Sequence, residues 1–198
     1  METTATSIIT TESLLNHWHG HRALTRRVIE AFPEKELFGF SIGSIRTFAQ
    51  LTHELISIGA PAIKAIVNRE ISTYAEPEGL DTKAKILEQW DKDTQTINQY
   101  WPQLKEEEFD ETFNLFGQYE FPIIQNILYF IDNEIHHRGQ GYVYLRALNI
   151  DPPFFWDRYW LLRSKKKSPE LVVSGIFLFI GYHSRSKTAG MSDLKLVI

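Results

Sequence analysis

Four long stretches of this 198-residue chain repeat apolar residues every three or four positions, and this repeat constrains the fold more than any other feature. Such spacing places the apolar side chains on one face of an α-helix. We predict helices over residues 11–31, 44–70, 81–104 and 121–149. Four helices of this length joined by moderate connectors predict an all-α protein built as a four-helix bundle.

Prolines mark several of the expected helix boundaries. Pro33 disfavours helical backbone at the residue before it, so the first helix should end there. Pro61 should kink or interrupt the second helix, whereas Pro122 suits the first turn of the fourth. The prolines in residues 151–153 stop that helix. Residues 113–121, FNLFGQYEF, are expected to form a loop or a short extended piece.

Composition excludes several classes of site and protein. There is no cysteine, which removes disulfides, cysteine-based zinc sites and a protein thiol nucleophile. The N-terminus lacks the basic and apolar pattern of a secretory signal. The longest apolar stretch, residues 171–182, falls short of the roughly 20 residues that a bilayer span needs. We therefore expect a soluble, cytoplasmic protein with no integral membrane span.

Charge divides the chain into two parts. Residues 158–198 hold eight basic and two acidic residues, a net charge of +6, so the total of −4 leaves −10 on residues 1–157. An acidic body repels phosphate backbones and argues against nucleic-acid binding. We assign residues 1–157 to the bundle and residues 158–198 to a basic C-terminal extension, peripheral or poorly ordered, whose structure the sequence does not define.

Two predicted helices carry the residues that could hold a metal. Asn133 and His137 lie four apart, so their side chains share a helix face about 5–6 Å apart at Cβ. A divalent ion bound about 2.0–2.1 Å from each ligand fits between two such side chains, although an amide oxygen is a weaker ligand than imidazole. His53 stands among apolar positions and should point inward. The alternative to a metal ligand is a core imidazole bonded to a backbone carbonyl or a neighbouring side chain. Asp132 and His136 form a further pair, read as a surface pair, a contact behind the metal ligands or a rival metal site.

Three more histidines lie near the N-terminus. His17 and His21 share a helix face while His19 points away, so the three do not form a compact site. We expect all three to be exposed or half-exposed. Arg138 can pair with Glu134 four residues earlier, and a structural role is expected for that pair.

The segments RTFAQLTHELISI, residues 46–58, and IDNEIHHRGQGYVYLRALNIDPPFFWDR, residues 131–158, point to a family. Together they resemble the DinB superfamily of small four-helix proteins, also described as DinB/YfiT-like metalloenzymes. The resemblance extends over residues 11–158 in helix order and spacing. Its most specific piece is HHRGQ followed by LRALNIDPP.

The resemblance implies a divalent metal, Ni, Zn or Mn, held by one histidine of the second helix and two of the last. Carried onto this chain, these positions are His53, Asn133 and His137, so an asparagine stands where the family has a histidine. Three possibilities stay open. Asn133 binds through its oxygen, the site recruits His136 or Asp132 instead, or the site is empty.

The resemblance also implies a function. We expect a metal-dependent enzyme acting on a small molecule, either an S-transferase that takes a low-molecular-weight thiol as cosubstrate or a hydrolase. No catalytic residue and no organic cofactor is assigned. The alternative is a non-catalytic helical module with a degenerate metal site that binds a ligand or dimerises. Aromatic residues such as Phe155 and Trp156 favour a homodimer, and a third reading is membrane association through the basic tail.

Overall fold

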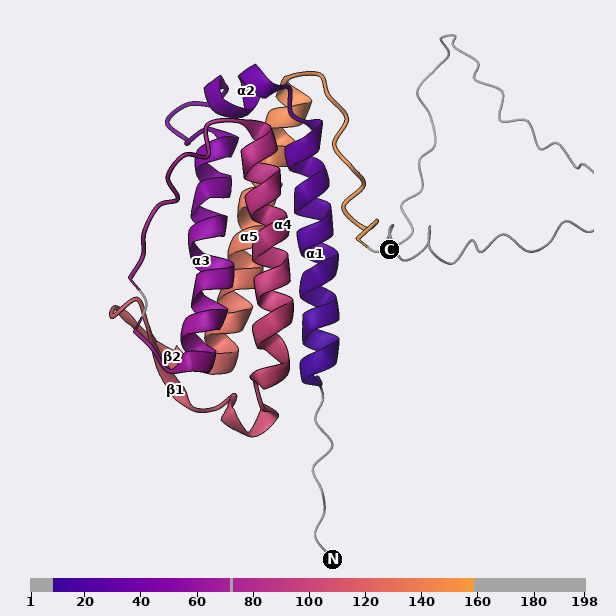
Figure 1. Cartoon of the computed structure of the whole chain (residues 1–198). Coiled ribbons are helices and arrows are strands. Elements are labelled where there is room, and N and C mark those ends of the chain that lie inside the picture. The colour runs from indigo at the N-terminus through magenta and orange to yellow at the C-terminus, as the bar shows by residue number, and fades with distance from the viewer. Residues whose placement is uncertain (1–8, 72, 159–198) are drawn as a thin grey trace, which may run out of the picture.

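The computed structural model describes residues 9–71 and 73–158. Four long helices of this part lie side by side in one bundle, and a short helix caps one end (Figure 1). The predicted all-α four-helix bundle is therefore confirmed. The five α-helices are α1 Thr11–Ala31, α2 Glu34–Gly39, α3 Phe48–Asn68, α4 Lys83–Tyr100 and α5 Ile123–Ala147.

Local chemistry explains where the helices begin. Thr10 accepts a hydrogen bond from the backbone of Ser13 and caps α1. At α3, Thr47 and Gln50 form a reciprocal capping box, which moves the start past the predicted residue 44. α3 continues through Pro61, so the predicted interruption does not occur. The short helix α2 was not predicted.

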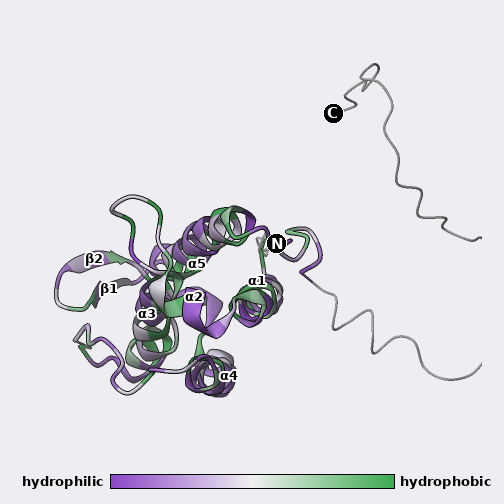
Figure 2. Ribbon diagram, turned by 90° about the horizontal axis from the view of Figure 1, so that it is seen from above, coloured by the Kyte–Doolittle hydropathy of each residue, from purple (hydrophilic) through white to green (hydrophobic). Residues whose placement is uncertain are grey.

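The connection between α4 and α5 contains two 3₁₀ turns, Trp101–Gln103 and Glu106–Glu108, and an antiparallel hairpin. Its strands are β1 Thr112–Leu115 and β2 Tyr119–Pro122. Phe116 and Gly117 have φ of 57° and 70° at the tip, and the glycine reduces the steric cost of this left-handed backbone. The expected loop or extended piece is thus a hairpin, which lies beside α3 and α5 when the bundle is seen from above (Figure 2).

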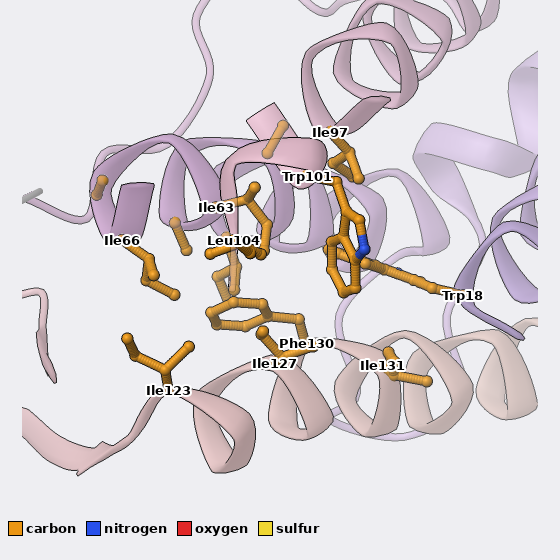
Figure 3. Packing of buried hydrophobic residues seen from close by; sticks show 14 of the residues in the cluster. Trp18, Ile63, Ile66, Ile97, Trp101, Leu104, Ile123, Ile127, Phe130 and Ile131 are labelled. Atoms are coloured by element: carbon orange, nitrogen blue, oxygen red, sulfur yellow. The ribbon is translucent and has the colours of Figure 1, made fainter. Parts of the chain in front are cut away.

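The core divides into two clusters along the bundle. In one, the ring of Trp18 lies 6.0 Å from that of Trp101 and 6.2 Å from that of Phe130 between centroids, and isoleucines pack around these rings (Figure 3). The other contains Trp90 and Phe48. Full burial of each large apolar side chain contributes roughly 1.5–3 kcal/mol to stability.

A glycine sets the close approach of α5 to α3. A Cβ placed on Gly141 would lie 2.4 Å from the ring of Phe48, which itself stacks on Phe32 with ring centroids 4.7 Å apart. Only a residue without a side chain fits this contact. The two helices that carry the predicted metal ligands are therefore held against each other at a defined register.

Among the described residues, none of the helices has the length and apolar character that crossing a bilayer demands. Of the predicted extension, only Arg158 belongs to the described residues. The division of the chain after residue 157 stays a prediction.

Candidate functional site

The carboxylate of Glu54 on α3 is the meeting point of the polar residues between α3 and α5. Its Oε1 lies 3.0 Å from Nε2 of His137 and accepts a hydrogen bond of 3.3 Å from Nδ2 of Asn133. Its Oε2 pairs with the guanidinium of Arg46. Glu54 thus joins two helices and the segment that precedes α3.

Hydrogen bonds keep Glu54 ionised. Burial of the carboxyl opposes its charge, but the hydrogen bonds from Arg46, His137 and Asn133 and the charge of His137 outweigh burial and lower the pKa of Glu54. The site therefore presents a carboxylate, a group able to bind a cation or to accept a proton.

His137 is buried and held at both ring nitrogens. Its Nδ1 lies 2.8 Å from Oε1 of Gln140, one turn further along α5, and its Nε2 contacts Glu54. A contact with a carboxylate requires a proton on Nε2. The imidazolium ion satisfies both contacts when Oε1 of Gln140 faces Nδ1. The neutral Nε2–H form satisfies both when Gln140 presents its amide nitrogen to Nδ1 instead. In either form, Glu54 and Gln140 fix the direction of the ring.

His53 faces a different partner. It is half-buried, and its Nε2 lies 3.1 Å from the carbonyl oxygen of Leu80, just before α4. Consecutive helical residues point about 100° apart, so Glu54 faces α5 while His53 faces the connection to α4. Burial lowers the pKa of His53, against the opposing effects of the Leu80 carbonyl and the charge of Glu76.

The predicted trio of His53, Asn133 and His137 is joined only in part. The contacts of the described residues bring Asn133 and His137 together at Glu54 and join His53 to Leu80. Within residues 9–71 and 73–158, no three or more His, Cys, Asp or Glu side chains are arranged to hold a metal ion. The three-residue ligand set stays a prediction.

Glu54 is the functional candidate that the sequence did not single out. It lies with Gln50 and Ser57 on a polar edge between two apolar rows of α3. The available signal was a carboxylate in the middle of a helix, with an apolar row on each side of it. Without the position of α5, nothing distinguished this edge from a solvated face.

The histidine expectations at the N-terminus need one correction. His21 is buried rather than exposed or half-exposed, because Nη2 of Arg138 reaches its Nδ1 at 2.9 Å across the bundle. Burial and the charges of Arg138, His17 and Arg158 lower the pKa of His21 to about 3. The ring is therefore neutral in the folded protein near neutral pH.

The predicted pair of Glu134 and Arg138 is part of a buried network. The two side chains lie 3.8 Å apart, and Glu134 also accepts hydrogen bonds from Trp18 at 3.0 Å and Thr25 at 2.7 Å. Arg138 donates in turn to Thr25 at 3.1 Å. These contacts tie α5 to α1 and support the structural role expected of Arg138.

A cavity of about 410 Å³ lies at the hairpin end of α5. It is lined by Leu115, Tyr119, Phe121, Gln125, Asn126 and Tyr129. Tyr129 is one turn from Asn133 and two turns from His137 on the same side of α5. Burial and then the charge of Glu54 raise the pKa of Tyr129, in accord with a short separation between the cavity and the carboxylate.

Comparisons with known proteins agree with this arrangement of helices. The model of the DinB family matches residues 1–164. A crystal structure of a DinB-like protein from Bacillus cereus ATCC 10987 is similar in fold, with a TM-score of 0.55 and 15% sequence identity, over 72% of this chain and 95% of that one. No curated protein matches the chain. Because the family model spans most of its length, the chain belongs to the DinB family.

Proposed function

We propose that this protein is a divalent-metal-dependent enzyme acting on a small molecule, as a transferase that uses a low-molecular-weight thiol or as a hydrolase. The observation that carries the proposal is the convergence of Glu54, Asn133 and His137 from two helices at one point. The adjacent cavity, lined by Tyr129, gives a small molecule a place to bind. Membership of the DinB family, with its resemblance to metalloenzymes, supports the metal.

The donor types fit a divalent cation. Imidazole nitrogen, carboxylate oxygen and amide oxygen are ligands that zinc, nickel and manganese accept. In this proposal His137 binds through Nε2 once it has lost the proton that faces Glu54, and Glu54 binds through its carboxylate. Asn133 binds through its amide oxygen once its amide group has turned, because its Nδ2 faces Glu54 without metal. The family resemblance implies His53 as the ligand from α3, whereas the contacts favour Glu54, because Glu54 contacts both Asn133 and His137 while His53 contacts the carbonyl of Leu80. The two ligand sets are separable by experiment.

A bound divalent metal would supply a nucleophile near neutral pH by lowering the pKa of a water molecule or of the thiol cosubstrate. The protein's own groups have distinct roles around it. Gln140 orients the ring of His137 from the side opposite Glu54. Arg46 positions the carboxylate of Glu54 but adds a positive charge that opposes a cation. The chain has no cysteine, so the thiol must come from the second substrate.

A non-catalytic ligand-binding module is the second candidate, and one observation favours it. Glu54 already receives hydrogen bonds or an ion pair from Arg46, Asn133 and His137. A carboxylate with three donors is satisfied without a cation. This candidate predicts a stable polar contact between α3 and α5 with no metal content.

Elemental analysis of protein purified without an affinity tag tests the first candidate against the second. We expect near-stoichiometric nickel, zinc or manganese in the wild type, and loss of the metal in His137→Ala and Glu54→Gln. His136→Ala is the matched control, because His136 is the exposed neighbour of His137. Metal-free wild-type protein that also fails to bind added Zn²⁺ in calorimetry would contradict the proposal.

His53→Ala distinguishes the ligand sets in the same experiment. Retained metal supports Glu54 as the α3 ligand, and lost metal with a native circular dichroism spectrum supports the set implied by the family resemblance. Activity screening then uses common cellular thiols with small electrophiles, and esters or amides for hydrolysis.

The homodimer and the cytoplasmic location are also retained as proposals. Phe154 and Trp156 stack with ring centroids 4.8 Å apart, and about two thirds of each side chain is exposed. A large exposed aromatic surface supports association. Sedimentation analysis of wild type and Trp156→Ala tests the dimer, which should dissociate more readily in the variant.

A further inference from the structure

The cavity between the hairpin and α5 has a lining that selects for one chemical class. Its volume of about 410 Å³ lies within the range of small-molecule sites. Three aromatic side chains, Tyr119, Phe121 and Tyr129, and Leu115 supply apolar surface. The remaining lining residues, Gln125 and Asn126, are neutral amides, so none of the lining side chains carries a charge at neutral pH.

The register of the hairpin explains why aromatic rings line this space. Leu115 pairs with Tyr119 and Phe113 pairs with Phe121, and paired residues of an antiparallel ladder project from the same face. Phe113 and Leu115 are buried, whereas Tyr119 and Phe121 remain about half exposed. The same face of the hairpin thus packs into the bundle along β1 and lines the cavity along β2.

The wall of the cavity is fixed to the bundle. Asn126 is buried on α5, and its Nδ2 donates to the carbonyl oxygens of Phe113 at 3.3 Å and Phe121 at 3.2 Å. One side chain therefore fastens both strands to the first turns of α5. The hairpin is held in place before any ligand binds, which reduces the entropy cost of binding.

The cavity lining contains no cationic side chain that could pair with an anion. Glu54 of α3 contacts Asn133, which lies one turn beyond Tyr129 on the same side of α5. Burial and then the negative charge of Glu54 raise the pKa of Tyr129 and that of Tyr74. The ring of Tyr74 contacts that of Phe116 at the tip of the hairpin, with centroids 6.0 Å apart. Aromatic surface thus continues from the cavity past the tip of the hairpin to Tyr74.

We propose that this cavity binds the flat, uncharged aromatic part of the substrate and directs its reactive group along α5 toward Glu54 and His137. The link to Glu54 and His137 rests on the proposed function, whereas binding of an aromatic group by the cavity does not. A neutral aromatic ring gains stacking contacts with Tyr119, Phe121 and Tyr129. A carboxylate on the same ring would lose hydration against a lining that offers it no cation, and so binds more weakly.

The test uses 2-naphthol as the neutral probe and 2-naphthoate as its anionic counterpart, with full-length protein treated with a chelator. Amide chemical shifts in ¹H–¹⁵N spectra report the location of binding. We expect 2-naphthol to shift signals of residues 115–129 and to bind at least about fivefold more tightly than 2-naphthoate. Because the protein is metal-free, failure of the metal site does not affect this result.

Variants assign the binding to the cavity. Tyr129→Ala and Phe121→Ala should each weaken 2-naphthol binding about five- to tenfold, as expected for loss of an aromatic contact. Both residues are half exposed, so the bundle should remain folded. Trp156→Ala is the matched control, since it removes an exposed aromatic ring elsewhere and should leave the affinity unchanged.

Three results would overturn the inference. The first is an absence of shifts for residues 115–129 at millimolar 2-naphthol. The second is unchanged affinity in both Tyr129→Ala and Phe121→Ala. The third is a set of shifts centred on residues 154–156 that Trp156→Ala abolishes.

Discussion

The carboxylate of Glu54 and the imidazole of His137 lie 3.0 Å apart and connect α3 to α5 through one polar contact. Apolar packing surrounds this contact along both helices. Asn133 donates through Nδ2 to the same oxygen of Glu54, so the side chains of three polar residues meet at one point. The proposed chemistry and several of the predictions below depend on this convergence.

Gly141→Ala should destabilise the bundle. The new Cβ would lie 2.4 Å from the Phe48 ring, and overpacking of this kind costs about 1–3 kcal/mol. Gly139→Ala is the control, because no atom lies within 4 Å of its Cβ position and alanine favours a helix by up to about 1 kcal/mol. Urea unfolding should show a lower free energy of unfolding than wild type for Gly141→Ala only. Equal stability of the two variants would contradict the close approach of α3 and α5.

Glu134→Gln should be strongly destabilising. The substitution leaves the buried guanidinium of Arg138 without its neighbouring carboxylate, and loss of one partner of a buried pair costs about 3–5 kcal/mol. Thermal unfolding should show a large fall in Tm. Glu88→Gln, which removes an exposed pair with Lys92, should leave Tm unchanged. A small effect of Glu134→Gln would mean that the network with Trp18 and Thr25 does not hold α1 to α5.

His21 should contribute to acid destabilisation. Its pKa is about 3 in the folded protein and near 6.5 when unfolded, so the unfolded chain binds the extra proton between these values. The contribution to stability is therefore complete above pH 6.5 and is lost as pH falls toward 3, at up to about 1.4 kcal/mol per pH unit. Asp93 has the opposite effect on the pH dependence of stability. Burial raises its pKa to about 6, so the folded protein binds the extra proton as pH falls below that value.

The comparison of wild type with His21→Gln isolates the contribution of His21 to stability, because Asp93 and the other carboxyls are present in both proteins. Urea unfolding at intervals from pH 7 to pH 4 should give a difference in stability that changes with pH in this range. A constant difference would show that His21 has an ordinary pKa in the folded state.

Arg46→Ala should strengthen binding of a divalent cation. Removing the guanidinium leaves the Glu54 carboxylate without its nearby positive charge. Because Arg46 is partly exposed, the expected gain in Zn²⁺ affinity is modest, up to about fivefold. Calorimetric titration at low salt measures it, with Arg69→Ala as a control for loss of a partly exposed arginine elsewhere. Weaker binding in Arg46→Ala would mean that positioning of Glu54 outweighs the charge.

The sequence predicted the long helices because their apolar periodicity and capping residues act within each segment. The hairpin was less visible, since its strands have only four residues each and β2 is mostly exposed. Burial of His21 was missed because Arg138, its partner, lies 117 residues away in the chain. Contacts over such separations depend on how the helices pack, which local patterns do not specify.

The candidate site shows the same limit. The i, i+4 spacing of Asn133 and His137 placed both side chains on one face of α5, and both contact Glu54 of α3. The sequence does not show which face of α3 meets these side chains, because His53 and Glu54 are neighbours that point about 100° apart on the helix. The rotation of α3 about its axis decides whether the imidazole or the carboxylate faces α5, and packing contacts such as Gly141 against Phe48 help to set that rotation.

The most direct measurement of the central claim is a long-range ¹H–¹⁵N spectrum of the histidine rings, recorded on ¹⁵N-labelled, untagged protein before and after addition of Zn²⁺. His53→Ala and His137→Ala assign the two relevant rings. We expect the Nε2 signal of His137 to move on metal addition, the ring signals of His53 to stay unmoved, and Glu54→Gln to abolish the change. An unmoved His137 signal, or equal movement of both rings, would contradict this expectation.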